Sequence, residues 1–178
     1  LKAAKDDRME AIFVLAVMTG MRLGELLGLE WANVDLDAGY LQVKSVLSEV
    51  NGRLKIKEPK TKSSRRRIDL PVKAVEALRR HQKRMIAEGL GQNAFVFPNQ
   101  HGQWWRRSHF HSQCYKPLLK KANLPAIRFH DLRHTSATLL LEDNIHPRLS
   151  RSVWDMPRSA SRWTPIRTCC RRCRKKRR

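Results

Sequence analysis

The composition of the chain changes abruptly after His146. Residues 147–178 contain ten Arg and two Lys against a single acid, Asp155, and show no helical or strand periodicity. So much charge with so little apolar surface cannot form a core, and we expect this segment to be disordered unless it binds an anion. Any compact fold must therefore be built from residues 1–146, a length that suits one domain. We treat residues 147–178 as a basic, non-native tail.

Residues 1–146 are predicted to be mainly helical. Apolar residues recur at helical spacing over 9–20, and 22–29 is predicted to be a short second helix after a Thr-Gly turn. Further helices are predicted over 71–89, 108–122 and 129–141. The side chains expected to face the core from the first and last of these three are Val75, Leu78, Gln82, Met85, Ile86, Leu132, Leu139 and Leu140.

A small antiparallel sheet is predicted between the second and third helices. Residues 40–47, 54–57 and 67–70 are its expected strands, and Asn51-Gly52 is typical of a hairpin turn. The predicted fold class is therefore α+β, mainly α, with a small three-stranded antiparallel sheet inserted among the helices.

The formal net charge of +21 favours a polyanionic partner, and nucleic acid is the leading candidate. A solvated basic surface without a partner is the alternative. The longest apolar run, residues 11–18, is too short to span a bilayer, so no membrane partner is expected. No signal peptide opens the chain, which favours a cytoplasmic location.

The cysteines do not favour a metal site. Cys114 stands alone, whereas Cys169, Cys170 and Cys173 lie close together and resemble half of a zinc site. A structural zinc needs four ligands, and no His lies near these three. No acidic cluster suited to two metal ions occurs either. We expect neither a metal nor another cofactor.

Basic side chains occupy unusual positions in three separate segments. Arg22 begins the second predicted helix, where backbone N–H groups also point outward. Lys60 and Lys62 lie in a turn between two predicted strands. His130 and Arg133 are three residues apart at the start of the last helix, and therefore lie on one helix face.

Such a set of side chains suits a phosphodiester. Arg forks pair with the non-bridging oxygens and stabilise the charge that develops on them. A Lys or His can give a proton to a leaving oxygen or take one from a nucleophile. Each residue alone is weak evidence, because most surface Arg and Lys are simply solvated. The prediction therefore depends on their convergence.

Three motifs that contain these residues resemble those of the tyrosine recombinases of the phage integrase family. They are TGMRLGELLGLEWANVD, PKTKSSRRRIDLP and FHDLRHTSATLLL, in the family's order and at its usual separations. The resemblance covers residues 11–146 and is strongest to integrases of phages and integrative elements. It implies the tyrosine-recombinase catalytic-domain fold, double-stranded DNA as the partner, and a bacterial or phage-encoded protein associated with the nucleoid.

The resemblance also implies a role for each matching residue. Arg22 and Arg133 would clamp the scissile phosphate, and His130 would assist proton transfer there. Glu25 resembles the acid that supports the first Arg of the family, with an ordinary surface or capping Glu as the alternative.

The lysine motif implies a general acid. Lys60 would protonate the departing deoxyribose oxygen, and Lys62 is the alternative assignment. The residues expected to contact DNA around the site are Lys62, Arg65, Arg66 and His134.

The nucleophile that the family uses has no counterpart in this sequence. In the family a Tyr attacks the phosphate to form a 3′-phosphotyrosyl link, and a Leu-Gly-His motif precedes that Tyr. Only Tyr40 and Tyr115 are present, both before His130, and we expect both to be packing residues. The chain as given is therefore expected to be catalytically inactive.

A frameshift near Pro147, natural or from sequencing, would explain these absences. Residues 153–156 must be encoded GTN-TGG-GAY-ATG, and the next frame gives Leu, Met or Val, then Gly, then His or Tyr. The same shift over residues 162–166 allows Leu-Asp-Thr-Tyr, which resembles the approach to the family's nucleophile. The alternative is an evolved basic tail, and the gene sequence decides between the two.

The family's N-terminal DNA-clamping domain is not found either, so residues 1–146 are expected to be an incomplete catalytic domain. The family acts as a tetramer on two DNA sites, and tetramer assembly by this chain stays open. Three functions are compatible with the sequence: an active recombinase, a non-catalytic DNA-binding remnant, and a general basic nucleic-acid-binding protein with accidental motif matches. The central prediction is that four side chains surround one phosphate: Arg22, Lys60, His130 and Arg133.

Overall fold

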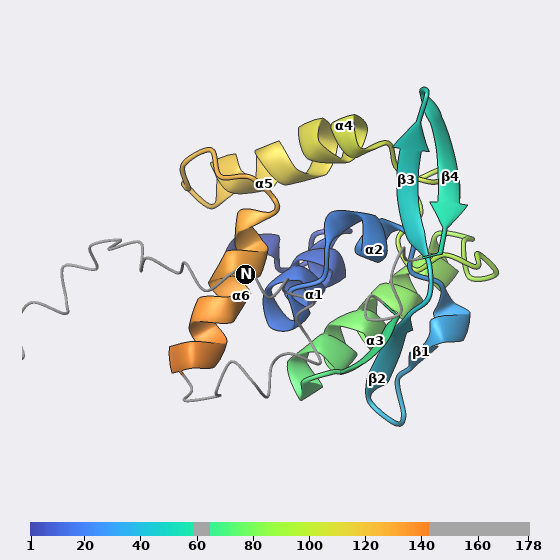
Figure 1. The fold of residues 1–178 in the computed structure, drawn as a ribbon, viewed down its shortest axis with the longest axis horizontal. Coiled ribbons are helices and arrows are strands. Elements are labelled where there is room, and N and C mark those ends of the chain that lie inside the picture. Colours follow the sequence, from blue (N-terminus) through green and yellow to red (C-terminus); the bar gives the residue numbers. More distant parts are fainter. Residues whose placement is uncertain (59–64, 143–178) are drawn as a thin grey trace, which may run out of the picture.

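The computed structural model describes residues 1–58 and 65–142, with side chains described up to residue 138. Figure 1 shows helices gathered around α1, with a small sheet and a β-hairpin on one side. The helical elements are η1 (Lys2–Ala4), α1 (Glu10–Thr19), α2 (Leu23–Leu27), η2 (Trp31–Asn33), α3 (Val72–Ala87), α4 (Arg107–Phe110), η4 (His111–Tyr115), α5 (Lys116–Lys121) and α6 (Asp131–Glu142). The predicted mainly helical α+β class is confirmed.

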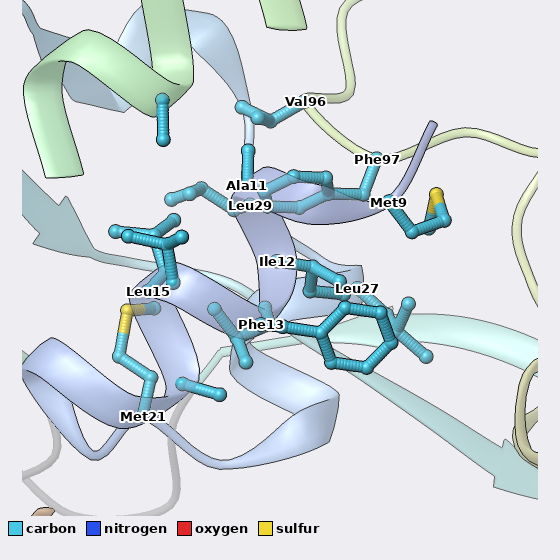
Figure 2. Packing of buried hydrophobic residues seen from close by; sticks show 14 of the residues in the cluster. Met9, Ala11, Ile12, Phe13, Leu15, Met21, Leu27, Leu29, Val96 and Phe97 are labelled. Carbon is cyan, nitrogen blue, oxygen red and sulfur yellow. The ribbon is translucent and has the colours of Figure 1, made fainter. Parts of the chain in front are cut away.

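The central helix α1 is buried on almost every side. Its sequence EAIFVLAVMT is apolar all round, as expected for a helix inside a domain, and it packs against α2, α3 and α6. Figure 2 shows Phe13 within the apolar core, near Leu27. The helix ends at Gly20, which adopts the left-handed conformation (φ 61°) that glycine tolerates without strain.

The sheet lies where the sequence predicts it, but its strands pair differently. The order of the three-stranded antiparallel sheet is β1 (Val34–Asp35), β2 (Tyr40–Val43) and β5 (Arg66–Asp69). Two further strands, β3 (Val46–Val50) and β4 (Arg53–Lys57), form a separate hairpin. The predicted strand 40–47 is thus divided between two sheets, because the chain leaves β2 after Val43 and starts the hairpin at Val46.

The helix predicted over 108–122 is present and contains one wide turn. Between α4 and α5, the N–H of Lys116 bonds to the carbonyl of His111, five residues earlier, which is the π-helical spacing of η4. Pro117 follows at once and has no N–H to donate, so the regular ladder of hydrogen bonds cannot continue through it. Figure 1 shows this composite helix along one side of the core.

The buried face of α3 differs from the predicted one. Leu78 and Met85 are buried as expected, but Gln82 is exposed and Ile86 is 62% exposed. His81 takes their place in the core at 5% exposure. The predicted face is therefore right at Leu78 and Met85 and wrong at Gln82 and Ile86.

Within residues 1–58 and 65–142, no helix combines the length and apolar character needed to span a membrane. No three His, Cys, Asp or Glu side chains gather there as metal ligands would. The predicted core positions Leu139 and Leu140, the tail cysteines and the tail 147–178 all lie outside the described side chains.

Candidate functional site

Arg22 stands at the start of α2, held by its own helix. The carboxylate of Glu25, one turn later, accepts from the backbone N–H of Arg22 at 2.9 Å and from its Nη1 at 3.1 Å. These two bonds to one carboxylate fix the direction in which the chain leaves the Gly20 turn. The Arg22 side chain stays 41% exposed, so an anion can approach it.

Arg133 connects α6 to that same turn. Its Nη1 donates to the carbonyl oxygen of Gly20 at 2.8 Å, across 113 positions of sequence. The Arg133 residue is only 6% exposed, so this charge-assisted bond forms inside the protein. Figure 1 shows α6 next to α1, and the two helices are in contact. The Arg22 turn and the start of α6 are therefore one structural unit.

His130 lies immediately before α6, at the surface of this unit. The preceding residue, Phe129, is 6% exposed and packs against Phe13, Phe110 and Tyr115, with ring centroids 5.3 to 6.3 Å apart. This aromatic cluster anchors the segment that carries His130.

The pKa of His130 is lowered from its ordinary value. Partial desolvation is the first cause, followed by the positive charges of His134, Arg133 and Arg22, against a smaller opposing effect of Asp131. The rings of His130 and His134 meet edge to face at 5.3 Å. His130 is therefore neutral at pH 7, able to donate one hydrogen bond and accept another.

Arg66 is placed differently from the sequence-based expectation of a DNA contact. It lies on the inward face of β5, only 9% exposed, and its Nη1 and Nη2 donate to the two oxygens of Glu25 at 3.2 and 2.9 Å. Burial alone would raise the pKa of Glu25, but the hydrogen bonds and charge of Arg66, then of Arg22, outweigh it and lower that pKa. Glu25 is thus an anion shared by two arginines.

The other predicted site residues lie at the surface or outside the described ranges. Arg65 is exposed and forms an ion pair with Glu58, and His134 is exposed. Lys60 and Lys62 fall within 59–64 and lie outside the described residues. The structure therefore brings Arg22, His130 and Arg133 together, with Glu25 and Arg66 behind them.

Neither tyrosine lies in this group. Tyr40 belongs to β2, where the guanidinium of Arg67 covers its ring at 3.8 Å. Tyr115 is 1% exposed in the aromatic cluster, and burial raises the pKa of its hydroxyl to about 12. The prediction that both are packing residues is confirmed.

The role of Arg66 was missed although a signal for it exists. In β5 the residues alternate, and Arg66 shares its side of the strand with Ile68, which is 1% exposed. A period of two therefore places Arg66 on the core face, where a charge needs a partner. Three consecutive arginines, 65–67, mask this alternation in the sequence.

The sequence and the fold match known proteins. Residues 1–151 match the model of the phage integrase family. The chain is 33% identical to a tyrosine recombinase XerC-like protein of Caldanaerobacter subterraneus, over 81% of this chain and 41% of that protein. It is 29% identical to the ICEBs1 integrase of Bacillus subtilis, over 74% of this chain and 37% of that protein. The chain thus spans about two fifths of these relatives.

Solved structures give the same result. An integrase of the transposon Tn1549, in complex with circular intermediate DNA, superposes with a TM-score of 0.70 at 25% identity, covering 85% of this chain and 53% of that one. The XerA recombinase gives a TM-score of 0.68 at 25% identity, with coverages of 88% and 52%. The predicted catalytic-domain fold is confirmed, and the chain belongs to the phage integrase family of tyrosine recombinases.

Proposed function

We propose that this chain binds double-stranded DNA and holds one phosphodiester at Arg22, His130 and Arg133, as part of a site-specific recombinase domain. The hydrogen bond from Arg133 to Gly20 carries the proposal, because it joins the helix that follows His130 to the turn that presents Arg22. Family membership and the DNA-bound integrase of similar fold support DNA as the partner. The net charge of +21 supports a polyanion in general.

Each side chain has a proposed task at the phosphate. Arg22, which is accessible, and Arg133, which lies behind it, would stabilise the charge on the non-bridging oxygens. Neutral His130 would hydrogen-bond an oxygen or move a proton. Lys60, with Lys62 as the alternative, would protonate the 5′-oxygen as its bond to phosphorus breaks and a tyrosine oxygen bonds to that phosphorus. The assignment of Lys60 or Lys62 as proton donor rests on the sequence motif alone.

We further propose that this polypeptide binds DNA without cutting it. The ring of Tyr40 lies under the guanidinium of Arg67, and Tyr115 is buried in the aromatic cluster. Residues 147–178 would be a frameshifted basic tail after the catalytic domain, 1–146. The function proposed for this chain is that of a DNA-binding remnant of a recombinase. Its proposed location is the nucleoid.

Removal of Arg22 tests the phosphate site. We expect Arg22→Ala to weaken binding to a duplex and to reduce the slope of log affinity against log salt by about 0.9, the contribution of one phosphate contact. Fluorescence anisotropy at several salt concentrations measures both quantities. Lys83→Ala, on the exposed side of α3, removes one charge far from the site and serves as the control. Equal losses in the two variants would mean that binding is only general attraction to a basic surface.

A nicked suicide duplex tests the absence of cleavage. Its cut strand releases a short fragment, so a covalent tyrosyl adduct would accumulate and migrate slowly on a denaturing gel. We expect no adduct from this chain, and an adduct would show that one of its tyrosines reaches the phosphate.

A further inference from the structure

Glu25 is almost fully buried, yet each of its carboxylate oxygens accepts hydrogen bonds from both Arg22 and Arg66. Oε1 accepts from Nη1 of Arg22 at 3.1 Å and from Nη1 of Arg66 at 3.2 Å. Oε2 accepts from the backbone N–H of Arg22 and from Nη2 of Arg66, both at 2.9 Å. The side chains of Glu25 and Arg66 are 2% and 5% exposed, whereas that of Arg22 is 41% exposed.

The two arginines therefore play unequal parts toward the shared carboxylate. Arg66 meets it as a two-pronged fork inside the protein, the strongest geometry for this pair. Arg22 makes a single side-chain contact with it from the partly exposed side. Because Arg66 supplies the buried counter-charge, the carboxylate does not have to draw Arg22 inward to be neutralised.

The backbone holds Arg66 firmly in this position. Arg66 pairs with Val43 across the antiparallel ladder of β5 and β2, and its neighbour on the same face, Ile68, is 1% exposed in the core. The residue is only 9% exposed, so its guanidinium lies inside the protein. DNA can reach Arg22 without reaching Arg66.

From this arrangement we infer that Arg66 is a positioning residue, which acts through Glu25 to keep Arg22 outward and available to a DNA phosphate, and which does not itself contact DNA. The inference rests on the proposed function, since the phosphate is the group that Arg22 is proposed to bind. Arg66→Gln leaves Arg22 as the basic partner of Glu25 among the described residues, and the buried carboxylate then draws Arg22 inward. Adding Glu25→Gln to this variant removes the negative charge that would draw Arg22 inward.

These relations predict a distinctive set of affinities for a mixed-sequence duplex, measured with the full chain over a range of salt concentrations. We expect Arg66→Gln to lower affinity by about tenfold, as loss of a charge-assisted contact does. The double variant Arg66→Gln with Glu25→Gln should recover much of that loss. In an Arg22→Ala background, Arg66→Gln should leave both the affinity and the salt slope unchanged.

A direct DNA contact predicts the opposite pattern. The loss from Arg66→Gln would then persist in the double variant, and would lower the salt slope by a further 0.9 or so in the Arg22→Ala background. Either result overturns the inference. If Arg22→Ala alone changes nothing, the proposed phosphate site fails instead, which is a separate outcome.

Folding is monitored by circular dichroism for every variant. Should Arg66→Gln unfold because it leaves a buried carboxylate, Arg66→Lys keeps the charge but cannot form the fork. We then expect Arg66→Lys to lose affinity in the wild-type background and to lose none in the Arg22→Ala background. A loss in both backgrounds contradicts the positioning role.

Discussion

His81 shows how a single residue links burial to pH. Its ring lies near Trp31 and Phe97, with centroids 6.4 and 5.0 Å away, and its Nε2 is 2.6 Å from the carbonyl oxygen of Val96. Burial lowers the pKa of His81, with the charge of Arg8 adding to the effect and the bond to Val96 opposing it. The folded protein therefore holds His81 neutral, as a donor to Val96.

This neutral histidine predicts loss of stability in mild acid. The unfolded chain binds a proton at His81 below pH about 6.5, and the folded chain does not, so acid favours unfolding. The free energy of unfolding should be flat above this pH and should fall below it with a slope approaching about 1.4 kcal/mol per pH unit. Urea unfolding between pH 5.5 and 7.5 measures it. His81→Gln should make this slope shallower and exposed His101→Gln should not. An unchanged slope in His81→Gln would refute the assignment.

At the scale of elements, the β3–β4 hairpin depends on a helix face without side chains. Gly24 lies in α2 and Gly28 caps its C-terminal end, and the start of β3 lies against both. A Cβ at Gly28 would come within 2.7 Å of the backbone nitrogen of Leu47. Ser45 adds a hydrogen bond from its Oγ to the carbonyl of Gly28 at 2.6 Å.

We therefore expect Gly28→Ala to loosen the hairpin. The added methyl group meets backbone rather than a mobile side chain, so the cost should be about 1–3 kcal/mol, as for other overpacked sites. Urea unfolding gives the loss, and amide exchange should show weaker protection in β3 and β4. Gly52→Asn at the hairpin tip is the control, since the space there is open and Asn tolerates φ 71°. Equal losses of stability in the two variants would contradict this account, because they would show that any substitution in this region weakens the hairpin.

The elements also show what local patterns can and cannot predict. Helix periodicity located α1, α3 and α6 because each is long enough for apolar spacing to repeat. The division of residues 40–47 between β2 and β3 was not predictable, since strand partners are chosen by contacts distant in sequence. The inward position of Arg66 follows from the alternation of β5, but its buried ion pair with Glu25, 41 positions away, follows from no local pattern.

At the scale of the whole molecule, the motifs predicted which residues would converge, but not how. Order and spacing of three motifs gave the family and the fold, and the family match over residues 1–151 confirms both. The bond from Arg133 to Gly20 spans 113 positions and follows from no local pattern. It makes the site a product of packing between α1 and α6, so changes in that interface should affect the phosphate site.

The central claim is that Arg22, His130 and Arg133 form one anion site. Titration of the full chain with inorganic phosphate, followed by NMR of the two arginine Nε–H groups and the His130 ring, tests this most directly. We expect all three signals to shift together with one common dissociation constant, and exposed Arg79 to stay unchanged. Separate dissociation constants for the three side chains, or no response at all, would contradict a shared phosphate site.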